Sequence, residues 1–194
     1  MNKQNGFSLI ELIVTLAIAA IVLSIGIPSF QAYIQNNRQT IAINELVTAL
    51  QLARNNAITQ RVPVTLCKSA DTAAATPTCS TGGGSGDWSQ GWILFTNPNN
   101  DTTLDPGETL LRVHGPLQGE ASFIGTGPVV NQVTFTPQGR ISNGFGGTIN
   151  LCDSRGAEHA KALVISLGGQ VRQATDSDGD NIVENGNGDP VSCP

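Results

Sequence analysis

The chain has 194 residues, of which 13% are charged, 5% are aromatic and 22 are glycines. A composition this rich in glycine and poor in charge favours a β-rich domain with many turns over a helical bundle. The formal net charge of −5 produces a negative potential that repels phosphate backbones, so composition argues against general nucleic-acid binding.

The first segment of the chain is long and apolar. Residues 12–37 carry no charge, and residues 7–27 would span roughly 31 Å as an α-helix, which is enough for the hydrocarbon core of a bilayer. The residues that interrupt this apolar run are Ser8, Glu11, Thr15, Ser24 and Gly26. Lys3 precedes the run, so the positive-inside rule predicts a cytoplasmic N-terminus, with the rest of the chain on the other side.

Two ordinary explanations of this segment fit poorly. A cleaved secretory signal peptide needs small residues after the apolar run, whereas residues 25–30 are IGIPSF. A plain membrane anchor would not place the carboxylate of Glu11 inside an apolar helix, because an unpaired charge is costly there. Glu11 is therefore the feature that an interpretation of this segment has to explain.

Residues 6–11, GFSLIE, together with the apolar run behind them, resemble the processing site of type IV pilins and pseudopilins. The resemblance implies that a prepilin peptidase cuts after Gly6, removing residues 1–6 as a leader, and that Phe7 becomes a methylated N-terminus. It also implies a partner for Glu11, which in the filament core of this class pairs with the N-terminal amine of a neighbouring subunit. Pro28 matches a position at which helices of the class bend or locally melt.

Past Phe30 the chain becomes polar, but no helix breaker occurs before Pro63. Apolar residues recur at helical spacing and give a single stripe. They are Ile43, Leu46, Val47, Leu50, Ala53 and Ala57. We predict one long helix, in which residues 7–30 form the transmembrane and assembly segment. Residues 31–61 continue it as an amphipathic helix that packs one face on a domain.

From residue 62 to residue 194 the pattern predicts an extracytoplasmic, β-rich globular domain with an acidic C-terminal tail. Short apolar runs alternate with polar or glycine- and proline-rich turns, as in antiparallel sheets. The expected strands are residues 64–67, 91–96, 109–113, 133–136, 148–152 and 162–166, with a last one around Val171. Residues 167–170, LGGQ, suit a tight hairpin turn. The predicted fold is α+β, a long N-terminal helix packed on an antiparallel β-sheet domain.

The four cysteines are Cys67, Cys79, Cys152 and Cys193. In an exported chain an even number of cysteines favours two disulfides, although four cysteines allow three connectivities. Cys67 and Cys79 enclose a short polar loop and form the expected local pair, which leaves Cys152 to bind Cys193. A four-cysteine zinc site is the alternative, but the sequence lacks the C-x-x-C pairs typical of such sites.

Motifs in the β region restrict the resemblance to particular groups within the class of type IV pilins and pseudopilins. They are residues 54–58 leading to 64–67, then 88–95, 105–108, 135–140 and 151–156. In this order they are similar to the H-type pseudopilins of type II secretion (GspH-like) and to the FimT/FimU minor pilins, as far as about Arg172. The resemblance implies a fold of the type IV pilin kind and a low-abundance subunit that helps to start a filament or caps its tip.

Three functions are compatible with these residues: a minor type IV pilin, an H-type pseudopilin of a type II secretion system, and a DNA-binding minor pilin of a competence pilus. The expected partners are major and minor pilins or pseudopilins, prepilin peptidase and the inner membrane, from which the subunit passes into a periplasmic or extracellular filament. The paired cysteines and the acidic tail favour the pilus. We expect no enzymatic activity, because His114 and His159 are isolated and no nucleophile motif occurs.

Asp176, Asp178 and Asp180 place carboxylates at alternate positions with Glu184 close behind, a spacing that suits calcium. The loop departs from an EF-hand because Asn181 stands at its sixth position, so a solvated acidic tail is the competing interpretation. No other cofactor is predicted. The same two interpretations, a calcium site or a capped turn, apply to the second acidic loop, which contains Asn100, Asp101, Asp105 and Glu108.

The DNA-binding interpretation depends on residues 169–172, GQVR. Some FimT-type pilins are thought to bind DNA through a Gly-Arg-x-Arg stretch, which this segment resembles in its second half only. Arg172 is the candidate DNA contact, and Arg140, Arg155 and Lys161 would add positive charge near it. The acidic run that follows works against this interpretation.

Overall fold

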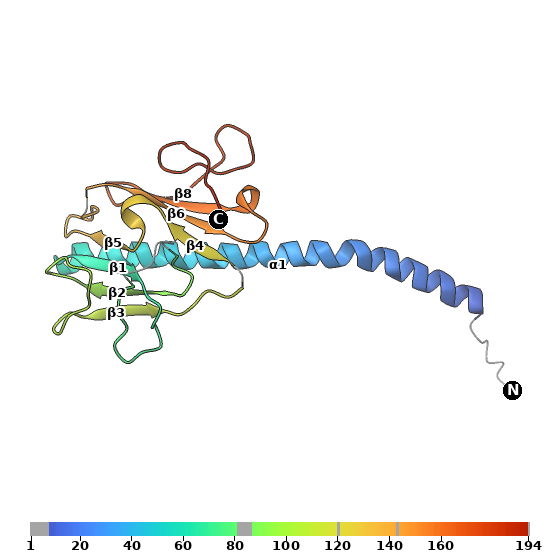
Figure 1. Ribbon diagram of the computed structural model, residues 1–194, viewed down its shortest axis with the longest axis horizontal. Helices are drawn as coiled ribbons and strands as arrows, with labels where there is room; N and C mark the ends of the chain where they lie inside the picture. Colours follow the sequence, from blue (N-terminus) through green and yellow to red (C-terminus); the bar gives the residue numbers. More distant parts are fainter. Residues whose placement is uncertain (1–7, 81–86, 120, 143, 194) are drawn as a thin grey trace. The chain divides into compact units, whose positions relative to one another are not determined.

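The structure is a computed structural model that describes residues 8–80, 87–119, 121–142 and 144–193. Its internal contacts divide the chain into two compact units, residues 1–38 and residues 39–194. A single helix, α1 (Leu9–Gln60), contributes residues to both units, and the strands belong to the second unit (Figure 1).

Helix α1 runs for 52 residues and continues through Pro28 without leaving helical geometry. The local melting that the resemblance allows at this proline is therefore not seen. From residue 39 onward one face of the helix is buried in the helical pattern that the apolar stripe predicts, although Val47 is only partly buried. The buried residues are Gln39, Ala42, Ile43, Leu46, Ala49, Leu50, Ala53 and Ala57.

The second unit contains two four-stranded sheets whose neighbouring strands pair antiparallel. The first has the order β3-β2-β1-β5, with β3 (Leu110–His114), β2 (Trp92–Thr96), β1 (Val64–Lys68) and β5 (Gln132–Phe135). The second has the order β4-β6-β7-β8, with β4 (Ser122–Gly125), β6 (Gly147–Cys152), β7 (Lys161–Ile165) and β8 (Val171–Gln173). Two 3-10 helices, η1 (Gly127–Val129) and η2 (Ala157–His159), lie in the connections.

The strands expected from the sequence are confirmed to within one residue at each end, but β4 was not predicted. It pairs with β6, where Phe123 stands opposite Leu151 and is fully buried. Its apolar run, Phe123 and Ile124, is too short to show the alternation by which strands are recognised.

The hairpin expected at residues 167–170 joins β7 and β8. The turn is closed by the N–H of Gly169, which donates to Ser166 O at 2.8 Å, and by the N–H of Ser166, which donates to Gln170 O at 2.9 Å. Gly169 has a φ of +75°, and a Cβ at this position would collide with the carbonyl oxygen of Gly139. Only glycine combines a positive φ at low cost with the absence of a Cβ, so this position requires it.

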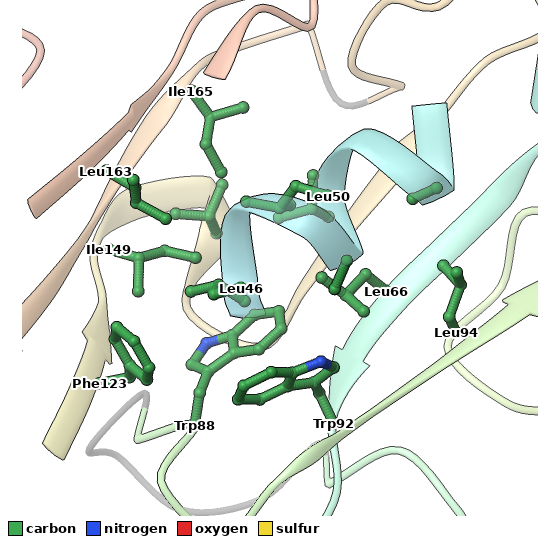
Figure 2. Packing of buried hydrophobic residues seen from close by; sticks show 14 of the residues in the cluster. Leu46, Leu50, Leu66, Trp88, Trp92, Leu94, Phe123, Ile149, Leu163 and Ile165 are labelled. Carbon is green, nitrogen blue, oxygen red and sulfur yellow. The ribbon is translucent and has the colours of Figure 1, made fainter. Parts of the chain in front are cut away.

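Helix α1 and the two sheets share one hydrophobic core. Leu46 and Leu50 of α1 lie between Leu66 of β1 and Ile149 of β6 (Figure 2). The two sheets also meet where the ring of Trp92 contacts the ring of Phe123, with centroids 6.3 Å apart and planes at 74°. Since each such buried side chain contributes roughly 1.5–3 kcal/mol, this half of the helix is an integral part of the domain.

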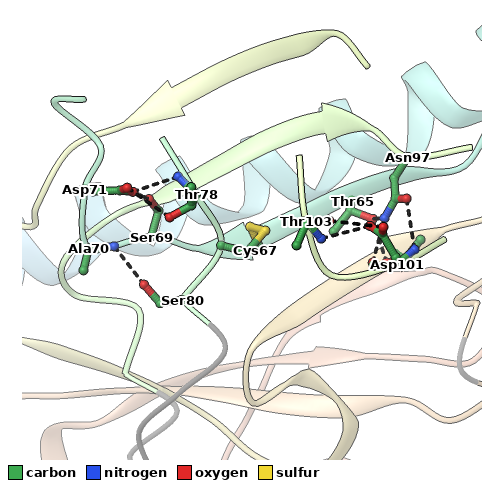
Figure 3. The surroundings of a disulfide bond; sticks show 12 residues. Thr65, Cys67, Ser69, Ala70, Asp71, Thr78, Ser80, Asn97, Asp101 and Thr103 are labelled. Carbon is green, nitrogen blue, oxygen red and sulfur yellow. Dashed lines mark hydrogen bonds between the residues drawn. A yellow bond between two sulfur atoms is a disulfide. The ribbon is translucent and has the colours of Figure 1, made fainter. Parts of the chain in front are cut away.

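The disulfides are Cys67–Cys79 and Cys152–Cys193, which confirms the expected pairing and excludes the zinc alternative. The first closes the loop after β1, where Asp71 Oδ1 accepts hydrogen bonds from the Thr78 N–H and the Ser69 hydroxyl, both at 2.8 Å (Figure 3). The Thr78 N–H is the main reason that the pKa of Asp71 lies below its ordinary value. The second disulfide joins β6 to the C-terminal tail, residues 174–193.

Candidate functional site

Ser8 and Glu11 form a capping box at the N-terminus of α1. The N–H and the hydroxyl of Ser8 both donate to Glu11 Oε2 at 3.1 Å, and the N–H of Glu11 donates to Ser8 Oγ at 3.3 Å. The box satisfies amides that the first helical turn leaves without intrahelical acceptors. Sequence reasoning assigned Glu11 to assembly alone, although its S-x-x-E spacing signals this second role. Gly6 and Phe7, the processing residues, lie outside the described residues.

The helical segment of the first unit exposes apolar side chains along its length. Leu9 is 77% exposed and Phe30 is 64% exposed, and the large hydrophobic side chains between them are exposed as well. The hydroxyls of Thr15 and Ser24 donate to carbonyl oxygens three residues earlier, at 2.9 and 2.7 Å, so these polar groups are satisfied within the helix. The helix is long and apolar enough to cross a membrane, and its apolar surface requires lipid or other subunits to cover it.

In the second unit, three side chains fasten the start of the buried helical segment to the sheet domain. Gln39 Nε2 donates to Asp153 Oδ2 at 2.9 Å, and Arg155 Nη2 donates to the same oxygen at 2.6 Å. We call these residues, Gln39, Asp153 and Arg155, the Asp153 clasp. Burial alone would raise the pKa of Asp153, but the hydrogen bonds from Arg155 outweigh burial and hold this pKa below its ordinary value.

Arg54 makes a second connection between α1 and the sheets. Its Nε donates to Gly139 O at 2.9 Å and its Nη2 donates to Gly168 O at 3.2 Å, so one guanidinium holds two turns. These contacts give the motifs at residues 54–58 and 135–140 a structural explanation, because the first supplies the arginine and the second supplies one of its acceptors.

Two of the three cations that were expected near Arg172, Arg155 and Lys161, have other partners. Arg172 is exposed on β8 and, with Arg54, lines a cavity of about 370 Å³. Arg155 belongs to the Asp153 clasp, and Lys161 Nζ donates to the hydroxyl of Thr40 at 2.7 Å. The ion pair with Asp153 offsets the charge of Arg155, so Arg155 adds less positive charge to a DNA-binding surface than the sequence suggests. The hydroxyl of Thr40 leaves the charge of Lys161 in place but ties its side chain to α1.

His114 has a structural role. Its ring stacks on Trp92, with centroids 3.9 Å apart and planes at 6°, and its Nε2 lies 3.0 Å from Glu45 Oε2. These contacts connect β3 to β2 and to α1. His159 lies in η2, in the connection between β6 and β7.

The second acidic loop is a set of capped turns. Asp101 Oδ1 accepts a hydrogen bond from the Thr103 N–H at 2.9 Å, and this bond is the main reason that the pKa of Asp101 lies below its ordinary value. The amide of Asn99 bridges Asp101 and Asp105, at 2.8 and 2.9 Å. Glu108 Oε2 accepts from the Asp105 N–H at 3.0 Å, while burial raises the pKa of Glu108. The carboxylates are used to organise the loop.

In the C-terminal tail, by contrast, four acidic residues bring their carboxylate oxygens close to one another. One carboxylate oxygen from each member of the group lies within 4.8 Å of the others. The members are Asp176, Asp178, Asp180 and Glu184. The three aspartates are exposed and Glu184 is buried.

Comparison with known families gives two matches. The model of the family described as "Type II transport protein GspH" matches residues 42–169, more than half of the chain. The model described as "Prokaryotic N-terminal methylation motif" matches residues 1–27. The C-terminal tail falls outside both matches.

Two crystal structures of the type IV minor pilin FimU from Pseudomonas aeruginosa share the fold, with TM-scores of 0.54 and 0.51 at 22% identity. The similarity covers 74% and 70% of this chain and 92% of each FimU chain. Among curated proteins, Fimbrial protein Q of Moraxella bovis is 44% identical over 46 residues, and a fimbrial protein of Pseudomonas aeruginosa is 43% identical over 58 residues. These matches span 24% and 30% of this chain and only 29% and 37% of the two relatives.

Proposed function

Since this chain belongs to the GspH family, and so to the class of type IV pilins and pseudopilins, we propose that it is a minor pilin that helps to initiate or cap a pilus filament. Proteins of this class are structural and non-enzymatic, and they assemble with other pilins or pseudopilins. The methylation motif in residues 1–27 implies processing as a prepilin, and the apolar helix implies a membrane-anchored subunit.

The observation that supports this proposal best is the exposed apolar surface of residues 9–30, with the carboxylate of Glu11 near its N-terminal end. A carboxylate covered by lipid or by other helices needs a cationic partner. In our proposal, cleavage after Gly6 frees the amine of Phe7, and Glu11 of one subunit pairs with this amine of its neighbour. The subunit waits in the inner membrane with a cytoplasmic N-terminus and then enters a periplasmic or extracellular filament.

Two features support a pilus over a secretion filament: the pair of disulfides and the acidic tail beyond the GspH match. FimU, whose fold this chain shares, is itself a type IV minor pilin. The description of the matching family supports the alternative, an H-type pseudopilin of a type II secretion system. A DNA-binding minor pilin of a competence pilus is the third candidate, and its support is Arg172, an exposed residue of β8.

Deleting the gene separates the three candidates. The amount of pilin sheared from the cell surface should fall in the deletion strain and return when the intact gene is restored. Undiminished pili with loss of exported enzymes would favour the pseudopilin instead. Undiminished pili with loss of transformation would favour the DNA receptor.

The capping box allows a sharper test of Glu11. Glu11→Gln keeps an acceptor for the Ser8 N–H but removes the charge, whereas Ser8→Ala removes the hydroxyl of the box and keeps the charge. If Glu11 pairs with a neighbouring amine, Glu11→Gln should reach the membrane in normal amounts but enter sheared filaments poorly, and Ser8→Ala should enter them well. Normal incorporation of Glu11→Gln, with poor incorporation of Ser8→Ala, would show that capping is the role that matters.

A further inference from the structure

The C-terminal tail folds back on the second unit. Val191 is buried, and it packs in a small cluster with Cys152 of β6. The N–H of Val191 donates to Val183 O at 3.0 Å, and the disulfide of Cys193 fixes the far end of the tail. The acidic loop at residues 176–184 is therefore held between β8 on one side and this cluster on the other.

The backbone of the loop turns its carboxylates toward one another. Asp176 accepts hydrogen bonds from the N–H groups of Gly179 and Asn181, at 2.7 and 3.0 Å, and Asp180 Oδ1 accepts from the Ile182 N–H at 2.8 Å. The group of four carboxylates, with ligand oxygens within 4.8 Å of one another, concentrates negative charge in a small space. Like charges at this separation repel each other, so the arrangement is unfavourable without a cation.

Glu184 adds a second observation at the group of four carboxylates. Its residue exposure is only 7%, and its Oε2 accepts a hydrogen bond from the Ser177 N–H at 2.8 Å. Its Oε1 is buried as well, and within the part of the chain that the structure describes it accepts no hydrogen bond. A buried carboxylate oxygen without a donor carries a desolvation cost that a bound cation would offset.

We propose that Asp176, Asp178, Asp180 and Glu184 bind a calcium ion. The donor set consists of carboxylate oxygens, which are hard ligands that calcium accepts in flexible geometry and in numbers that leave room for water and backbone carbonyls. Nitrogen and sulfur ligands, which zinc prefers, are not part of the group. The site is not an EF-hand, because Asn181 replaces the glycine of the turn and Glu184 stands at the ninth position of the loop.

The binding test uses the full chain in detergent, freed of divalent cations with a chelator and titrated with calcium chloride in a calorimeter. Asp178→Asn and Glu184→Gln keep the carbonyl oxygens that accept from the Asp180 and Ser177 N–H groups. Each variant should nevertheless bind calcium more weakly by roughly tenfold or more, the scale on which changes around metal sites act. Asp189→Asn is the matched control, since Asp189 is an acidic tail residue outside the group, and it should bind as the wild type does.

Thermal unfolding gives a second readout whose sign changes with calcium. In chelator, Asp178→Asn should unfold at a higher temperature than the wild type, because it relieves repulsion among the carboxylates. In calcium, it should unfold at a lower temperature, because the wild type gains binding energy that the variant lacks. The proposal is overturned if the wild type binds no calcium, if magnesium chloride binds equally well, or if the variant shifts unfolding in the same direction with and without calcium.

Discussion

Removing the Cys152–Cys193 disulfide should cost more stability than removing Cys67–Cys79. Cys152 and Cys193 are separated by 41 residues in sequence, whereas Cys67 and Cys79 are separated by 12. In the chain-entropy model a cross-link restricts the unfolded chain more as the closed loop lengthens, which gives about 3.9 kcal/mol for the longer loop and about 2.8 kcal/mol for the shorter at 25 °C. The difference of about 1.1 kcal/mol depends only on the ratio of the two loop lengths.

The removal of either disulfide can be compared directly, because the two pairs of cysteines are buried to a similar extent. Cys67 and Cys152 are 1% and 2% exposed, so replacing each pair by alanine leaves a comparable small cavity. The double variants Cys67→Ala/Cys79→Ala and Cys152→Ala/Cys193→Ala would be unfolded with denaturant as full chains in detergent, with calcium chelated. Trp88 and Trp92 are buried in the core of the second unit, so their fluorescence follows its unfolding.

The expected order is wild type, then the variant without the short-loop disulfide, then the variant without the long-loop disulfide. Equal losses in the two variants, or a larger loss for the short loop, would refute the reasoning from loop-closure entropy. A long-loop variant as stable as the wild type would also contradict the view that this disulfide restrains the tail in the unfolded chain.

Two further predictions concern single side chains. Asp153→Asn should lower the free energy of unfolding by about 1–3 kcal/mol at pH 7, because it weakens the charged hydrogen bonds of the Asp153 clasp. Since the pKa of Asp153 is depressed by folding, its contribution is present above the unfolded value of about 3.9 and is lost as the pH falls through the folded value. Denaturant unfolding of the two proteins should therefore converge in acid, and parallel pH profiles would contradict this. Arg172→Ala should weaken binding of duplex DNA by the full chain and reduce the slope of its salt dependence by about 1, whereas absent or salt-insensitive binding by the wild type would remove the DNA-binding candidate.

Elements with a clear period could be predicted from the sequence. The stripe through Ile43, Leu46 and Leu50 predicted the buried face of α1, because a helix repeats every 3.6 residues. Strand order could not be predicted, because β1 pairs with β5 across three intervening strands, with Val64 opposite Phe135. Such pairing depends on contacts between residues that are distant in sequence, which local patterns do not encode.

The candidate sites could be predicted only where a local pattern marks them, because contacts between residues distant in sequence leave no local pattern. Glu11 could be predicted because it is a charged residue in an apolar run. The acidic group of the tail could be predicted in part because Asp176, Asp178 and Asp180 stand at alternate positions. The burial of Glu184 depends on a fold-back of the tail, in which Glu184 bridges to Pro190, and local spacing carries no sign of it. The engagement of Arg155 with Asp153, rather than with a basic surface, likewise depends on where the connection after β6 meets the helix.

The burial of the second half of α1 in the core shared by both sheets has a mechanical consequence. The stripe from Ala42 to Ala57 belongs to the hydrophobic core that both sheets share, so a pull along the helix axis would load this packing in shear. Under shear the side chains must leave their pockets together, whereas peeling would release them one after another. The Asp153 clasp and Arg54 add polar links between the helix and the sheet domain. Tension applied to the helix would therefore be carried by the whole sheet domain and not by a single contact.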